Sequence, residues 1–309
     1  MLLVAYRLGQ RHFPDRTSKF SNSPFTLPQL FACLVLREHQ NKSYRGTEAL
    51  LRDCPQWCAD IGLPRTPDHN TLCEAFKILK PKALQQLLGD TVQAARRRGL
   101  IRGRLKPAAI DSSLFESHHV SRHFERRCQE TARKSRRKQA KIQANLRRAR
   151  TVKRLPKLSL AVASASHVIL AARATTGGGG DQPFFPLLLA EACRRCKVHV
   201  AVADAGYDSE ANHLSARRDL GVRSIIPPDS GRPTAKLPPT RYRRHMRRRF
   251  QRQADQRWYG QRWQAETVNS MIKRNLGSAL RATTARRRSY ELLLRVITHN
   301  LMILAQSGG

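Results

Sequence analysis

Hydrophobic residues recur three or four positions apart through the first hundred residues, and short polar or proline-containing breaks separate these stretches. This spacing places the apolar side chains on one face of a helix. It predicts four helices, over residues 27–38, 44–54, 70–79 and 82–97. Small helices in a basic chain are typical of a module that binds DNA or mediates oligomerisation.

Beyond Pro107 the hydrophobic pattern changes to short runs that read as strands, and helical periodicity returns between them. The predicted strands cover residues 108–110, 158–163, 168–174, 198–202 and 222–226. The predicted helices cover residues 184–194, 210–219, 262–274 and 289–304. Strands followed by alternating helices and strands in one segment favour an α/β fold, a mixed sheet covered by helices.

The net charge of the chain indicates what kind of ligand the protein binds. The chain has 58 Lys and Arg against 22 Asp and Glu in 309 residues, a formal net charge of +36. Two basic segments carry much of it, residues 122–157 and residues 241–257. Such a charge is typical of a protein that binds a polyanion, above all a nucleic acid.

Composition also excludes some classes of protein. The seven cysteines are an odd number scattered over a long chain, which does not indicate a disulfide framework. No apolar run approaches the roughly 18 residues of a membrane-spanning helix, and the first residues lack the pattern of a signal peptide. We expect a cytoplasmic protein that associates with the nucleoid.

Two of the scarce acids come directly after predicted strands. Asp111 follows the strand 108–110, and Asp204 follows the apolar alternation that ends at Ala203. Ligands of α/β proteins collect just past the carboxyl ends of strands, so both carboxylates are candidates for a site. The alternative is that each aspartate caps a turn or a helix, a common role for this residue.

Glu266 is a candidate third acid because of its neighbours on a predicted helix. At about 100° per residue, Tyr259, Arg262, Glu266 and Lys273 fall within an arc of roughly 60°, whereas Ala265, Val268, Met271 and Ile272 lie elsewhere and can pack on the sheet. The alternative is a solvated helix face on which Arg262 and Glu266 pair. Gly260 also makes it possible that Tyr259 precedes the helix.

The run Tyr259-x2-Arg262-x3-Glu266-x6-Lys273 resembles the Y-x2-R-x3-E-x6-K signature of DDE transposases encoded by bacterial insertion sequences. The segment 204–208 is similar to the family's second-aspartate segment, and 110–122 is similar to the first. The segments 43–45 and 67–72 are similar to the helical N-terminal region of these enzymes. The C-terminal signature is the most specific of these matches.

The resemblance implies an RNase H-like catalytic domain and a transposase. Asp111, Asp204 and Glu266 would be the catalytic residues and would hold two Mg²⁺ ions, or Mn²⁺ in their place. Tyr259, Arg262 and Lys273 would contact the transposon-end DNA. The enzyme would cleave the ends of an insertion sequence and join the freed 3′-OH to target DNA, since two metal ions stabilise both the attacking and the leaving oxygen.

We therefore predict two parts: a helical N-terminal region, residues 1–105, and an RNase H-like domain, residues 106–309, interrupted by a basic helical insertion at about 116–157. Further DNA contacts are expected from Arg122, Arg136, Arg137 and Lys138. The expected partner is double-stranded DNA, as terminal inverted repeats and as target, bound by a homodimer. The alternatives are a non-catalytic DNA-binding transposase remnant and a stand-alone metal-dependent nuclease.

Overall fold

The structure is a computed structural model, and it describes residues 1–309 except 17–22, 106, 118–154, 177–178, 230–236 and 308–309. Its N-terminal part is helical, as predicted. The helices are α1 (Leu2–Gly9), α2 (Leu27–His39), α3 (Tyr44–Asp53), α4 (Pro55–Asp60), α5 (His69–Ile78) and α6 (Pro81–Arg97). Helix α2 begins at a capping box, in which Thr26 and Gln29 each accept a hydrogen bond from the other's backbone N–H. The pattern did not predict α1 and α4.

A five-stranded sheet follows, in the order β4-β3-β1-β5-β6. Its strands are β1 (Ala108–Leu114), β3 (Pro156–Ala163), β4 (Ile169–Thr176), β5 (Val200–Ala203) and β6 (Arg223–Ile225). Strand β3 runs antiparallel to both β1 and β4, whereas β1, β5 and β6 are parallel. The predicted mixed sheet flanked by helices is therefore confirmed.

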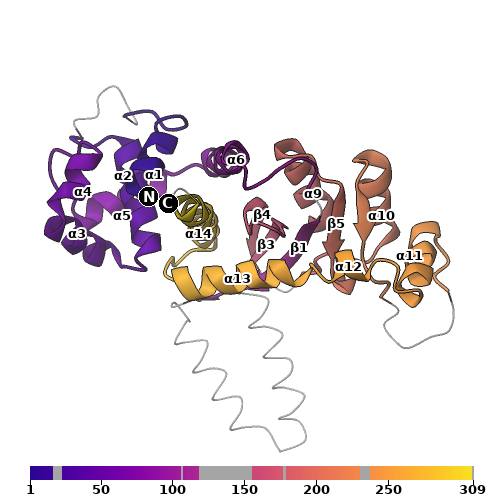
Figure 1. The fold of residues 1–309 in the computed structure, drawn as a ribbon. Coiled ribbons are helices and arrows are strands. Elements are labelled where there is room, and N and C mark those ends of the chain that lie inside the picture. The colour runs from indigo at the N-terminus through magenta and orange to yellow at the C-terminus, as the bar shows by residue number, and fades with distance from the viewer. Residues whose placement is uncertain (17–22, 106, 118–154, 177–178, 230–236, 308–309) are drawn as a thin grey trace, which may run out of the picture.

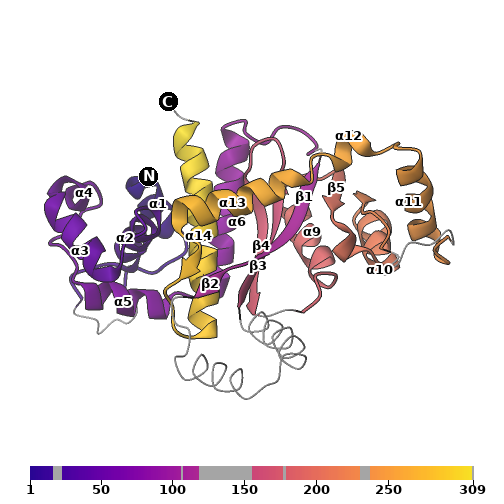
Figure 2. The same cartoon turned by 90° about the horizontal axis from the view of Figure 1, so that it is seen from below.

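Helices cover both faces of the sheet (Figure 1), with α13 (Trp263–Leu276) on one face and α6 and α9 (Phe184–Arg195) on the other. The N-terminal helices α1 to α5 lie beyond the β4 edge, and α11 (Arg241–Gln251) lies beyond the opposite edge, as Figure 2 shows from a second side. The remaining elements are β2 (Glu116–Ser117), η1 (Ala205–Tyr207), α10 (Glu210–Leu214), η2 (Ser215–Asp219), α12 (Gln256–Tyr259), β7 (Ala279–Leu280) and α14 (Ala285–Gln306).

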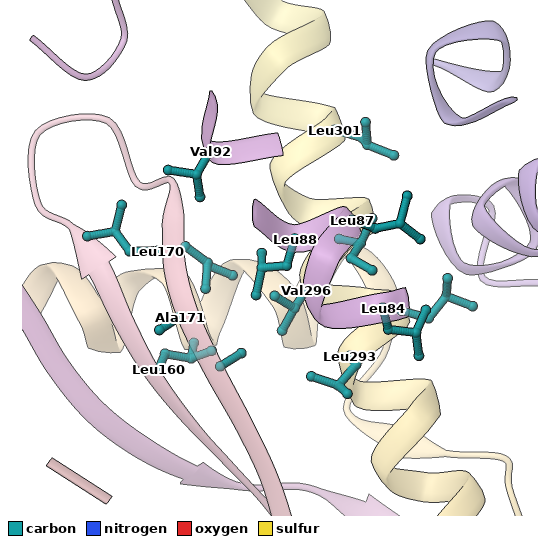
Figure 3. Close-up of a cluster of buried hydrophobic side chains, with 14 of the residues drawn as sticks. Leu84, Leu87, Leu88, Val92, Leu160, Leu170, Ala171, Leu293, Val296 and Leu301 are labelled. Atoms are coloured by element: carbon teal, nitrogen blue, oxygen red, sulfur yellow. The ribbon is translucent and has the colours of Figure 1, made fainter. Parts of the chain in front are cut away.

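The core joins the N-terminal helices to the sheet through α6 and α14 (Figure 3). Leu84, Leu87 and Leu88 of α6 are almost completely buried beside α14, with Leu88 on the side of the sheet strands. Val296 of α14 and Leu170 of β4 are buried in the same cluster. This layer holds the sheet, and with it any residue at the strand ends, against a rigid helical support.

The structure corrects one expectation about the sheet. Strand β1 does not end before Asp111 but continues to Leu114, because residues 111–114 keep their pairing with β3. Of the predicted basic insertion, residues 118–154 lie outside the described part of the chain, and its two ends belong to β2 and β3. The division of the chain at residue 105 remains a prediction. No described helix is long and apolar enough to cross a membrane.

Candidate active site

The register of the sheet places Asp111 beside Asp204. The parallel pairing of β1 with β5 ends at Ile110 and Ala203, so the two aspartates are the next residues on neighbouring strands. The short helix η1 begins directly after Asp204. Asp111 lies inside a strand. The capping alternative is therefore wrong for Asp111. Asp204 is the N-cap residue of η1 and a hydrogen bond from the Gly206 backbone lowers its pKa, so for Asp204 the turn alternative is not contradicted.

Helix α13 brings the third acid, Glu266, close to the two aspartates. Its residues Ala265, Val268 and Ile272 are completely buried and Met271 is partly buried, and the helix packs on β1 and β3. Glu266 then lies on the side of the helix that faces the strand ends. A pocket of about 330 Å³ opens between β1 and α13, lined by Asp111, Ser113, Glu266, Asn269, Ser270, Lys273 and Arg274.

The three carboxylates act on one another electrostatically. Burial raises the pKa of Asp111, and the negative charges of Asp204 and Glu266 raise it further. Burial also raises the pKa of Asp204; the positive charge of Arg262 opposes this change, and the charges of Asp181 and Glu266 add to it. Like charges held together in a half-buried site favour a ligand that brings positive charge.

Arg262 and Glu266 form an ion pair, as the solvated-face alternative expected. The pair does not exclude a site, because Arg262 also faces Asp204 closely enough to influence its pKa. Tyr259 ends α12, so it precedes the helix that carries Glu266. Its ring packs edge-on against Phe250, with 5.0 Å between the ring centroids. Tyr259 thus packs beside α11 but also borders the site. Burial raises its pKa, the charge and the hydrogen bond of Arg262 lower it, and the charges of Asp204 and Glu266 raise it.

Lys273 lies at the other end of the pocket. Its Nζ donates a hydrogen bond of 2.7 Å to Ser113 Oγ and lies 5.1 Å from the centroid of the Phe115 ring. Burial lowers the pKa of Lys273, while the nearby charges of Glu116 and Asp111 oppose the change. The ammonium group is therefore positioned by β1, close to the carboxylates.

The sequence reasoning missed Asn269. Its Nδ2 donates a hydrogen bond of 3.1 Å to Asp111 Oδ2, and its side chain is buried. Its Oδ1 is also buried and has no hydrogen-bond partner. The signal that could have found it is its place one turn after Glu266, close to the polar stripe of the same helix.

A divalent cation suits the chemistry of these donors, because hard cations prefer carboxylate and amide oxygens. Asp204 Oδ1 and Asn269 Oδ1 are buried oxygens without a hydrogen-bond partner. In the arrangement described, however, no three His, Cys, Asp or Glu side chains among the described residues are gathered tightly enough to hold a metal ion. Glu266 is paired with Arg262 instead.

The structure thus brings Asp111, Asp204 and Glu266 to one edge of the sheet, with Arg262 and Lys273 on either side of Glu266 along the chain. Tyr259 packs against Phe250 and lies close enough to Arg262, Asp204 and Glu266 for these groups to change its pKa. The remaining predicted DNA contacts, Arg122, Arg136, Arg137 and Lys138, lie outside the described residues.

Comparison with known proteins identifies one similarity. The family described as "Transposase DDE domain" matches residues 103–301, which is more than half of the chain. The matched region contains the whole sheet, α13 and the three carboxylates. The curated proteins and the solved structures gave no match.

Proposed function

The chain belongs to the transposase DDE domain family, and from this premise we propose that Asp111, Asp204 and Glu266 are its catalytic residues. Members of this family cleave DNA, transfer strands and act with divalent metal ions. Their fold is RNase H-like, a mixed sheet flanked by helices, as in this chain. The finer proposal is that this enzyme cleaves the ends of an insertion sequence and joins the freed 3′-OH to target DNA.

One observation carries the proposal: the residues that follow the last paired positions of β1 and β5 are both aspartates, and the charge of Glu266 raises the pKa of each. We propose that these carboxylates hold two Mg²⁺ ions, for which Mn²⁺ can substitute. Bound there, the ions would stabilise the attacking and the leaving oxygen of a phosphodiester. Asn269 would keep Asp111 oriented through its hydrogen bond.

Arg262 and Lys273 would bind phosphates on either side of the reacting bond. Arg262 now pairs with Glu266. A DNA phosphate offers Arg262 a bidentate partner in its place, and the Glu266 carboxylate is then free to turn toward the aspartates. Lys273 is positioned by Ser113 and Phe115 as a point charge. DNA binding would in this way complete the acidic site.

The DNA substrates proposed are the terminal inverted repeats of the element and a target duplex. Joining two ends to one target requires two active sites, and a homodimer in the DNA complex would supply them. Tyr259 would contact the transposon-end DNA from its position between Phe250 and Arg262. The positive charge of the chain favours association with duplex DNA of any sequence.

The test is to replace Asp111, Asp204 and Glu266 one at a time by Ala. Each variant should lose Mg²⁺-dependent cleavage of an end-bearing duplex and keep its affinity for that duplex in the absence of metal. Ser270→Ala is the matched control, because Ser270 is an exposed neighbour in the same pocket. Near wild-type cleavage by the Glu266→Ala protein would refute the assignment.

A further inference from the structure

A second pocket lies away from the three carboxylates, on the α11 side of the sheet. It has a volume of about 580 Å³ and is lined by Arg217, Pro239, Arg241, Tyr242, Arg244, His245 and Arg248. Each charged residue in this lining is an arginine, and no described acidic residue lines the pocket. A group of guanidinium groups without a carboxylate among them favours an anionic ligand.

The arginines share one face of the helix. Arg241, Arg244 and Arg248 stand at positions i, i+3 and i+7 of α11, and His245 stands at i+4 on the same face. The three arginines are exposed, and none of them forms an ion pair with a described residue. Arg244 donates to the carbonyl oxygens of Pro238 and Pro239 instead, at 3.1 and 2.9 Å.

Acidic residues bind α11 at its N-terminus and through two of its other arginines. Glu210 accepts hydrogen bonds from the backbone N–H groups of Tyr242 and Arg243 at the start of the helix. The buried Asp208 binds Arg243, with 2.7 Å between Oδ2 and Nε. The buried Asp255 binds Arg249, with 2.8 Å between Oδ1 and Nη2. These contacts fix the helix so that the stripe of Arg241, Arg244 and Arg248 faces outward.

Repulsion among the cationic side chains of the pocket also indicates a negatively charged ligand. Burial lowers the pKa of Arg217, and the charges of Arg223 and Arg249 act in the same direction. Burial also lowers the pKa of His245, as do the charges of Arg217 and Arg249. The charged groups that act on His245 are thus mainly cationic, Arg217, Arg249 and Arg223, and Asp255 opposes them. A bound anion would relieve this repulsion.

We propose that this pocket is a second DNA-binding site, which holds phosphates of the duplex next to the segment being cleaved. Over the seven steps from Arg241 to Arg248 the helix rises about 10 Å, and successive phosphates of one strand advance about 3.4 Å along the duplex axis. The stripe therefore fits a row of phosphates better than one small anion. Figures 1 and 2 place α11 beyond the sheet edge opposite the N-terminal helices, with the strands that carry Asp111 and Asp204 in between.

The inference rests on the proposed function only in taking DNA as the polyanion. The test compares Arg241→Gln/Arg244→Gln/Arg248→Gln with a control of equal charge change, Arg97→Gln/Arg102→Gln/Arg104→Gln, whose arginines are exposed near the end of α6. Affinity for duplex DNA is measured without divalent metal between 50 and 200 mM salt, a range in which counterion release is strong. Cleavage therefore cannot affect the result, and a failure of the proposed carboxylate roles would leave it unchanged.

The pocket variant should bind duplex DNA more weakly. The slope of log K against log salt should become shallower by about 0.9 for each phosphate that the protein no longer neutralises, so by roughly 2 to 3 for the three arginines. The control should change the slope by much less. Equal changes in the two variants, or an unchanged slope in the pocket variant, would overturn the proposal.

Two further measurements keep the test decisive. The single Arg248→Gln variant removes a side chain that makes no hydrogen bond or ion pair with a described residue, so it leaves the fold intact and should lower the slope by about 0.9. Inorganic phosphate at matched ionic strength tests the other source of the ligand. If phosphate binds the wild type and not the pocket variant, while both proteins bind duplex DNA with the same affinity and salt slope, the pocket binds free phosphate and the proposal is overturned.

Discussion

The hydrogen bond from Asn269 to Asp111 gives a prediction that connects the helix to the chemistry. Replacing Asn269 by Leu keeps a similar side-chain volume and removes the donor that lies 3.1 Å from Asp111 Oδ2. The site is buried, so water does not simply replace the amide. We expect Asp111 to lose its fixed orientation toward α13.

The magnitude follows from the kind of bond. A hydrogen bond to a charged group contributes about 1.5–3 kcal/mol, and each 1.36 kcal/mol corresponds to a tenfold change in rate. If the bond is used fully in the transition state, Asn269→Leu should slow single-turnover cleavage roughly 10- to 150-fold. The affinity of the metal-free protein for DNA should be unchanged.

A pH profile separates positioning from a general loss of structure. The Asn269 amide lowers the pKa of Asp111 against the stronger effect of burial, so its removal raises that pKa further. The acid limb of cleavage should therefore shift to higher pH in Asn269→Leu. Thr267→Ala is the control, since its hydroxyl binds only the Trp263 carbonyl of the same helix. A variant with a wild-type rate and an unshifted acid limb would refute the positioning role.

The other predictions concern stability, charge and specificity. Arg295→Met leaves the buried Glu291 without its cation, while Glu38 keeps Arg37. Loss of one partner of a buried pair costs about 3–5 kcal/mol; urea unfolding should show this loss of stability, and an unchanged midpoint would contradict it. Asp111→Asn should stabilise the metal-free protein, because a folded-state pKa raised by burial and by like charges disfavours the ionised aspartate. This gain should be complete above the raised pKa and vanish below the ordinary value of about 3.9, so a gain that persists in acid would argue against it. Lys273→Ala should reduce discrimination between end-bearing and scrambled duplexes and slow cleavage, because Lys273 is fixed by Ser113 and Phe115; equal loss of affinity for both duplexes would show a non-specific role.

Local patterns in the sequence predicted much of the fold. The four N-terminal helices with clear apolar spacing and the five strands of the sheet were all identified. Helix α11 was not, because six arginines in eleven residues give it little apolar periodicity. It is stabilised by tertiary contacts to Glu210, Asp208 and Asp255, which no local pattern reveals.

The candidate site was also predicted from local patterns only in part. The signature of Tyr259, Arg262, Glu266 and Lys273 identified the helix, and the acids after apolar runs identified the strands. The extension of β1 past Asp111 depends on pairing with β3, some fifty residues further along the chain, so the local pattern ended the strand too early. Asn269 could not be assigned a partner without the packing of α13 on β1.

Strand transfer is the most direct test of the central claim. A duplex that ends at the exposed terminus of the element, with a 3′-OH, is incubated with a target plasmid and Mg²⁺, and joined products are resolved on a gel. The account predicts joining by the wild-type protein, no joining when the end carries a 3′-deoxy nucleotide, and no joining by Glu266→Ala. Cleavage without joining would indicate a stand-alone nuclease, and joining of the 3′-deoxy end would contradict attack by the 3′-OH.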